Sequence, residues 1–240
     1  MTVQELHYDF DVKFDRVSSL SKPDFLPAEK DWLLNEAQSM LIKQKYNNKL
    51  NPGFETSQKR IDDLKSLVVK FPAQAPLSPT RVSSDLYTLS LSDLAFPYLF
   101  YISGKAKLVD PRNNCSSTAI LRFIPHDDLY RSLKDPWNKT NSSSIIFNFA
   151  SSPTPNQDAI YLYSGDFEIE SVYIDYIRHP LRINLGTYEY IDGIIYPPQS
   201  SELPEHTHNE VVDLAVFLAS SITESPEMIP NKAQILGINE

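Results

Sequence analysis

Residues 27–46 have the sequence PAEKDWLLNEAQSMLIKQKY, which predicts the helix around which the rest of the chain is arranged. Pro27 suits the first position of a helix, where its missing N–H is not needed. Acidic residues follow in the first turn, and Lys43 and Lys45 lie in the last, as the helix dipole favours. Apolar side chains recur at steps of three and four residues on one face, which consists of Leu33, Leu34, Ala37, Met40 and Leu41. We therefore expect an amphipathic helix that packs on a core.

A second helix is expected after the helix-breaking residues 47–53. It begins near Thr56 and ends before Pro72, because proline cannot continue a helix. Its apolar face consists of Ile61, Leu64, Leu67 and Val68. The two helices form a hairpin that has neither paired carboxylates beside a histidine nor the spacing of metal ligands. We expect this hairpin to pack on a core, with no chemistry of its own.

Both ends of the chain also predict helices. Residues 1–17 fit either a strand or a helix, but Thr2 and Glu5 have the spacing of a capping box, and aspartate and lysine are poor strand residues. We therefore expect a helix there. Residues 202–224 predict another, with Pro204 near its first turn. Its apolar stripe consists of Val211, Leu214, Ala215, Leu218 and Ile222, and Val212 and Phe217 widen it.

The middle of the chain has the pattern of a β-structure. Strands are expected at residues 86–91, 98–103, 119–124, 145–149, 159–163 and 169–177, with 105–109 as a continuation of the second strand and 181–184 as an extension of the sheet. Gly104 marks a bulge or a turn, and residues 126–133 form a short helix or turn. Residues 164–166, Ser-Gly-Asp, are typical of a hairpin between the last two strands. Short strands at regular spacing indicate an antiparallel sandwich or small barrel.

The order of helices, strands and helix predicts an α+β fold. The economical arrangement closes the last helix onto the first ones, so that they form a helical bundle with the strands inserted. Residues 1–72 and 201–226 would then form a helical connector domain, residues 85–200 an inserted β domain, and residues 227–240 a flexible tail.

Composition excludes several classes of site. Six glycines against eighteen prolines argue against glycine-built phosphate loops, and a net charge of −9 argues against gripping a phosphate backbone. The single cysteine, Cys115, excludes an internal disulfide framework and a cysteine-rich zinc site, and we expect a buried or partly buried, inert thiol. The sequence shows neither a signal peptide nor an apolar stretch that could cross a bilayer, which predicts folding in a reducing cytoplasm.

The histidines give no convincing catalytic or metal site. His206 and His208 are two residues apart on a helix and so point to different sides, which makes a poor metal pair. His126, Asp127 and Asp128 lack the spaced oxygen ligands of a calcium loop and are expected in a loop or helix cap. Walker, dinucleotide, nucleophile-elbow and zinc-protease motifs are all absent. We therefore predict no catalytic residue, no cofactor and no metal.

Residues 31–38, DWLLNEAQ, are followed by GFETSQKRIDDL at residues 53–64. This order resembles the N-terminal signature of virion structural proteins of crAss-like, short-tailed bacteriophages. In that family the first helix has leucine, then asparagine or threonine, then glutamate-alanine-glutamine. A glycine-phenylalanine-glutamate turn and an arginine-rich helix follow it. SVYIDYIRHP at residues 171–180 and LPEHTHNEVVDLAV at residues 203–216 are similar to the same proteins. The resemblance covers most of the chain, although residues 59–60 are Lys-Arg where some relatives have longer arginine runs.

The resemblance implies a head-to-tail connector or tail ring (adaptor) protein without enzymatic activity. Such proteins assemble as rings, typically of twelve copies, below the portal, and genomic DNA passes through the lumen. The implied partners are further copies of the chain, the portal protein and adjacent tail ring proteins, with no membrane and no specific binding of DNA. The implied location is the virion neck or tail, after assembly in the cytoplasm of the bacterial host. The helical part is also similar, more distantly, to adaptor and tail tubular proteins of other short-tailed phages.

Physical arguments agree with such a ring. Part of the −9 charge is expected to face the lumen, because like charge prevents DNA from adhering to its walls. Contacts with partners are expected from the long loops at residues 73–85, 110–117 and 134–143 and from the tail beyond residue 226.

Two other function classes stay open. A receptor- or carbohydrate-binding tail module would present tyrosines of the strand block to sugar, although core or subunit contacts also explain aromatic residues at period two. A hydrolase would assemble scattered residues of that block, with His126 and Asp127 among them.

Overall fold

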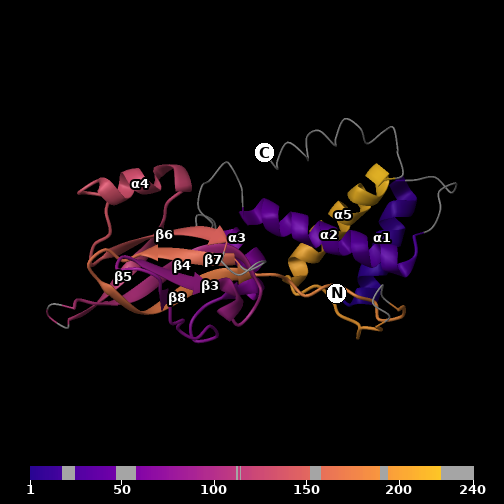
Figure 1. Cartoon of the computed structure of the whole chain (residues 1–240). Coiled ribbons are helices and arrows are strands. Elements are labelled where there is room, and N and C mark those ends of the chain that lie inside the picture. The colour runs from indigo at the N-terminus through magenta and orange to yellow at the C-terminus, as the bar shows by residue number, and fades with distance from the viewer. Residues whose placement is uncertain are drawn as a thin grey trace. The chain divides into compact units, whose positions relative to one another are not determined.

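The computed structural model describes residues 1–17, 25–46, 58–111, 113, 115–151, 158–189 and 194–222 (Figure 1). The chain divides into two compact units, which we call the helical unit (Met1–Leu67 and Pro180–Glu240) and the sheet unit (Val68–His179). The predicted α+β class is confirmed, with helices at both ends of the chain and a sheet inserted in the sequence between them. The helical unit resumes at Pro180, whereas the sequence assigned residues 85–200 to the inserted part. The linker at 18–24, the turn at 47–53 and the tail from 226 lie outside the described residues.

Helix α1 (Val3–Val17) begins with the capping box that its sequence predicts. The backbone N–H of Thr2 donates to Glu5 Oε2 at 2.8 Å, and the N–H of Glu5 donates to Thr2 Oγ1 at 3.3 Å. These two bonds satisfy N–H groups that have no partner inside the helix, and they favour a helix over a strand. The apolar side chains that α1 buries are Val3, Leu6, Phe10 and Phe14.

Helix α2 (Pro27–Tyr46) has the predicted bounds, and both α1 and α2 pack against α5 (Glu205–Ile222). The predicted apolar stripe of α5 is partly wrong, because Leu214 and Leu218 are half-buried and Ile222 is 56% exposed. The face of α5 that packs against α1 and α2 has smaller apolar side chains instead. The buried apolar face of α5 consists of Val211, Val212, Ala215, Val216 and Ala219.

The second predicted helix is shorter than expected. Helix α3 (Gln58–Leu64) passes into the short 3₁₀ helix η2 (Lys65–Leu67) and then into strand β1 (Val68–Val69). Val68 and Val69 pair with Ile177 and Tyr176 of strand β8, so their assignment to a helix was wrong. The two valines are β-branched, and the bonds offered by a neighbouring strand decide their conformation. The predicted start near Thr56 lies outside the described residues.

Among the described residues of the sheet unit, eight strands form one curled, mixed sheet, a half-barrel in the order β1-β8-β4-β5-β6-β7-β3-β2. All neighbouring pairs are antiparallel except β5 and β6, which are parallel and are connected through α4 (His126–Lys134). The other strands are β2 (Thr80–Arg81), β3 (Leu86–Ser90), β4 (Tyr98–Val109), β5 (Ser116–Phe123), β6 (Ser144–Ser151), β7 (Asp158–Tyr163) and β8 (Glu168–Arg178), with a short 3₁₀ helix η3 (Leu91–Asp93) after β3.

The expected hairpin between β7 and β8 is wrong. A turn with Gly165 at φ 60° does connect them, but β7 pairs with β6 and β3, whereas β8 pairs with β4 and β1. The turn therefore links strands that are not neighbours in the sheet. Gly104 lies within β4, which continues through it, and a Cβ at this position would lie 2.8 Å from Leu121 Cδ1. Close approach of β5 explains this glycine.

Alternate residues of β8 contribute to the core of the sheet unit. Val172, Ile174 and Tyr176 are fully buried, and the residues between them are half-buried. The hydroxyl of Tyr176 donates to Phe96 O at 3.1 Å, which satisfies its polar atom inside an apolar cluster. The predicted extension of the sheet at residues 181–184 is wrong, because this segment leaves the sheet and is bound by α2.

Candidate assembly surfaces

Polar side chains of α2 hold the segment that follows β8. Asn35 accepts a hydrogen bond from Ile183 N and donates one to Ile183 O, both at 2.9 Å, as a neighbouring strand would. Gln38 Nε2 donates to Leu181 O at 3.2 Å, and Gln38 Oε1 accepts from Ser201 Oγ at 2.7 Å. These contacts explain why this segment does not extend the sheet: a helix already satisfies its backbone groups.

Asp31 is the third polar residue of this row, and its side chain is buried. Its carboxylate accepts from Leu185 N at 2.9 Å, from the Tyr188 hydroxyl at 2.6 Å and from His7 Nε2 at 2.7 Å. Three donors satisfy a carboxylate that is only 2% exposed. Asp31, Asn35 and Gln38 of the DWLLNEAQ stretch therefore join α1, α2 and the segment 181–188, which is a structural role.

A second buried carboxylate, Asp63, connects α2, α3 and α5. Lys45 Nζ lies 2.9 Å from Asp63 Oδ2 and 2.8 Å from Glu210 Oε2, and His206 Nε2 lies 2.7 Å from Asp63 Oδ1. Burial by itself would raise the pKa of Asp63, but hydrogen bonds from Lys45 and His206 outweigh it and lower this pKa. Burial would lower the pKa of Lys45, and its two carboxylate partners raise it instead.

The histidines singled out in the sequence bind separate partners. His206 belongs to the Asp63 cluster, whereas the buried His208 donates from Nε2 to Leu203 O at 2.8 Å, and burial lowers the pKa of His208. His126 lies in the first turn of α4, where Nε2 donates to Phe149 O at 2.7 Å. Among the described residues, no three His, Cys, Asp or Glu side chains are grouped so that they could hold a metal.

The expectation for Cys115 is wrong, because its side chain is exposed. It precedes β5 in the connection from β4, where its carbonyl accepts from Asp110 N at 3.0 Å.

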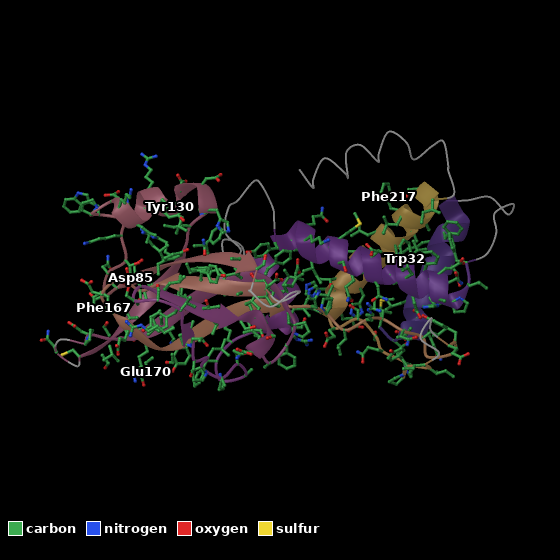
Figure 2. All side chains as sticks on the ribbon, viewed as in Figure 1. Trp32, Asp85, Tyr130, Phe167, Glu170 and Phe217 are labelled. Carbon is green, nitrogen blue, oxygen red and sulfur yellow. The ribbon has the colours of Figure 1, made fainter. Side chains whose placement is uncertain are left out.

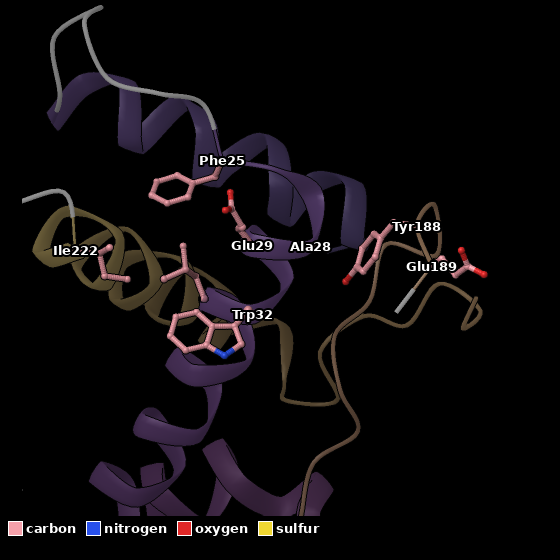
Figure 3. Close-up of a pocket in the computed structure, with 8 residues that line it drawn as sticks. Phe25, Ala28, Glu29, Trp32, Tyr188, Glu189 and Ile222 are labelled. Atoms are coloured by element: carbon pink, nitrogen blue, oxygen red, sulfur yellow. The ribbon is translucent and has the colours of Figure 1, made fainter. Parts of the chain in front are cut away.

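A cavity of about 370 Å³ opens on the helical unit beside Trp32 (Figure 3). Its walls come from the first turns of α2, the last residue of α5 and the segment near Tyr188. The described lining consists of Phe25, Ala28, Glu29, Trp32, Leu33, Tyr188, Glu189 and Ile222. Trp32 and Ile222 remain 53% and 56% exposed, so the cavity is apolar and open to solvent. A pocket of this kind accepts an apolar or aromatic group.

The sheet unit has a second apolar surface around α4. Trp137 is 91% exposed and Tyr130, on α4, is 75% exposed; Figure 2 labels Tyr130 there, and Trp32 and Phe217 on the helical unit. Trp137 belongs to the polar loop 134–143 that the sequence assigned to partner contacts. The sequence does not predict this exposure, because a tryptophan in such a loop can be buried in a core as well as exposed to solvent. Large apolar side chains that are exposed to this extent are candidates for contacts with other proteins.

The tyrosines of the strands are mostly used inside the sheet unit. Tyr87 and Tyr176 are buried, and Tyr98 and Tyr101 pack against the apolar core. They leave few rings free to stack on sugar.

The sequence was compared with protein families and with curated proteins. A family model described as phage tail ring protein 3/4 matches residues 1–227. None of the curated proteins matches the chain. No helix among the described residues has both the length and the apolar character needed to span a bilayer. Because the family match extends over nearly all of the 240 residues, the chain belongs to the tail ring protein 3/4 family of crAss-like phages.

Proposed function

We propose that this tail ring protein forms a closed ring of identical subunits, twelve in number, in the neck of the virion. The ring joins the capsid portal to the tail, and genomic DNA passes through its lumen. The family match over residues 1–227 carries the proposal, because it supports a structural role in the virion tail and assembly with other tail ring proteins. A structural family also favours the absence of enzymatic activity. The subunits assemble in the cytoplasm of the bacterial host.

Two features of the molecule support this function. The helical and sheet units each expose large apolar side chains, such as Trp32 and Trp137, which neighbouring subunits could cover. The net charge of −9 suits the wall of a channel for DNA, since an acidic wall does not hold a phosphate backbone.

The test is native mass spectrometry and electron microscopy of the purified chain, alone and mixed with the portal and the other neck proteins of the same phage. Twelve-fold rings that bind the portal are the expected result. A lumen lined by lysine and arginine would contradict an acidic channel that does not hold DNA. A chain that stays monomeric in every mixture would contradict the ring itself. A receptor- or sugar-binding module remains the second hypothesis, but the packed tyrosines of the strands give it no support.

A further inference from the structure

Trp137 is presented to solvent on a well-ordered turn. The backbone N–H of Trp137 donates to Asp135 Oδ1 at 3.0 Å, and Asn138 Nδ2 donates to Asp135 Oδ2 at 2.5 Å. The N–H of Lys139 donates to Asp135 O at 2.9 Å, and the guanidinium of Arg122 donates to Asn138 O. The backbone that carries this 91% exposed side chain is already held, so a partner that covers Trp137 has mainly the indole itself to immobilise. Burial of its indole removes about 150–250 Å² from water, which is a strong driving force.

The cavity beside Trp32 is a suitable receptor for such a group. Its volume of about 370 Å³ exceeds that of one indole ring, and Phe25, Trp32 and Tyr188 offer aromatic faces and edges to it (Figure 3). It lies on the surface of the helical unit, so an incoming side chain needs no rearrangement of the core.

The charges around the two features are complementary. Arg131, Lys134 and Lys139 surround the sequence position of Trp137, and the one acidic residue among them, Asp135, is used within the turn. This cluster is basic in a chain whose net charge is −9. The cavity has the opposite charge, since Glu29 and Glu189 belong to its lining.

A ring of identical subunits needs two different surfaces on each subunit that fit each other, because every contact repeats head to tail. Exposed Trp137 and the Trp32 cavity are such a pair on one chain. We propose that Trp137 of one subunit inserts into the Trp32 cavity of the next, with the lysines beside it facing Glu29 and Glu189. This inference rests on the proposed function, because it names the contact by which the ring would close.

The test uses two full-length variants whose defects complement each other. Trp137→Ala removes the inserting side chain but keeps the cavity. Ala28→Phe fills the cavity but keeps Trp137, and Ala28 is exposed in the first turn of α2, so the helical unit tolerates the larger ring. Tyr130→Ala removes another exposed aromatic group of the sheet unit and is the matched control. Sedimentation velocity measures the size of the particles that each variant forms.

The wild type and Tyr130→Ala should assemble, whereas each of the other two variants should be monomeric at the same concentration. Loss of an inserted tryptophan is expected to weaken each contact at least about 30-fold. An equimolar mixture of Trp137→Ala and Ala28→Phe should form dimers and nothing larger, because it restores one contact per pair.

Two outcomes would overturn the inference while leaving the ring in place. One is assembly of Trp137→Ala like the wild type; the other is a mixture that stays monomeric. A chain that ends at residue 222 and stays monomeric while Trp137→Ala assembles would assign the cavity to the C-terminal residues instead. A wild type that never assembles, even with the other neck proteins, would overturn the proposed ring and this contact with it.

Discussion

Replacing Asn35 with alanine should destabilise the helical unit by about 2–6 kcal/mol. Asn35 pairs with both the N–H and the C=O of Ile183, each at 2.9 Å. Ile183 is only 2% exposed, so water has little access to these groups when the amide is gone. A buried backbone group without a partner costs about 1–3 kcal/mol, and the substitution leaves two of them.

The two tryptophans of the chain allow this loss to be measured in one unit. Trp32 belongs to the helical unit and Trp137 to the sheet unit, so a Trp137→Phe background leaves a fluorescence signal from the helical unit alone. Urea unfolding in this background gives the free energy of unfolding for Asn35→Ala and for Glu36→Ala, whose exposed side chain is the neighbouring control. If Asn35→Ala loses less than about 0.5 kcal/mol, as an ordinary surface substitution does, the row of polar contacts on α2 is not what holds the segment.

Three further predictions concern single side chains. Burial lowers the pKa of His208 below its usual 6.5, so His208 takes up a proton more readily in the unfolded chain than in the folded one. The free energy of unfolding should therefore be highest above about pH 6.5 and decrease as the pH falls below that value. His208→Gln should flatten this slope in urea midpoints measured between about pH 5 and pH 7.5, whereas His126→Gln in the sheet unit should leave it unchanged. Asp63→Asn should cost about 3–5 kcal/mol at neutral pH, because Lys45 loses a buried partner. Since the pKa of Asp63 is lowered from 3.8, the cost of Asp63→Asn should shrink as the pH falls below about 4, and an unchanged cost would contradict the pairing. Gly104→Ala should cost about 1–3 kcal/mol in the sheet unit, because its Cβ would lie 3.1 Å from the backbone oxygen of Tyr173 as well as 2.8 Å from Leu121 Cδ1; urea unfolding followed by circular dichroism measures the loss.

Features set by neighbouring residues were predictable from the sequence. The capping box at Thr2 and Glu5 identified α1, and proline with charged ends gave the bounds of α2. The family was also recognised from the order of its packing motifs, although each motif is weak by itself.

Features decided by distant partners were not predictable in this way. Val68 and Val69 fit a helical face by their spacing, but β8 binds them as a strand. Residues 181–184 look like a strand, but Asn35 and Gln38 on α2 satisfy their backbone. The buried face of α5 differs from the predicted stripe because α5 packs against both α1 and α2. The exposure of Trp137 has no signature in the neighbouring sequence.

The pairing of β1 with β8 has a consequence for how such proteins diversify. The sheet unit begins at Val68 and ends at His179, and Val68 pairs with Ile177 in adjacent strands, so its two ends leave the sheet about 5 Å apart. An insert whose ends are so close can enter one loop of a host domain without separating the host's own segments. The sheet unit can therefore be replaced as a whole. Recombination at these two junctions would give tail ring proteins new binding surfaces while the helical unit keeps its fold.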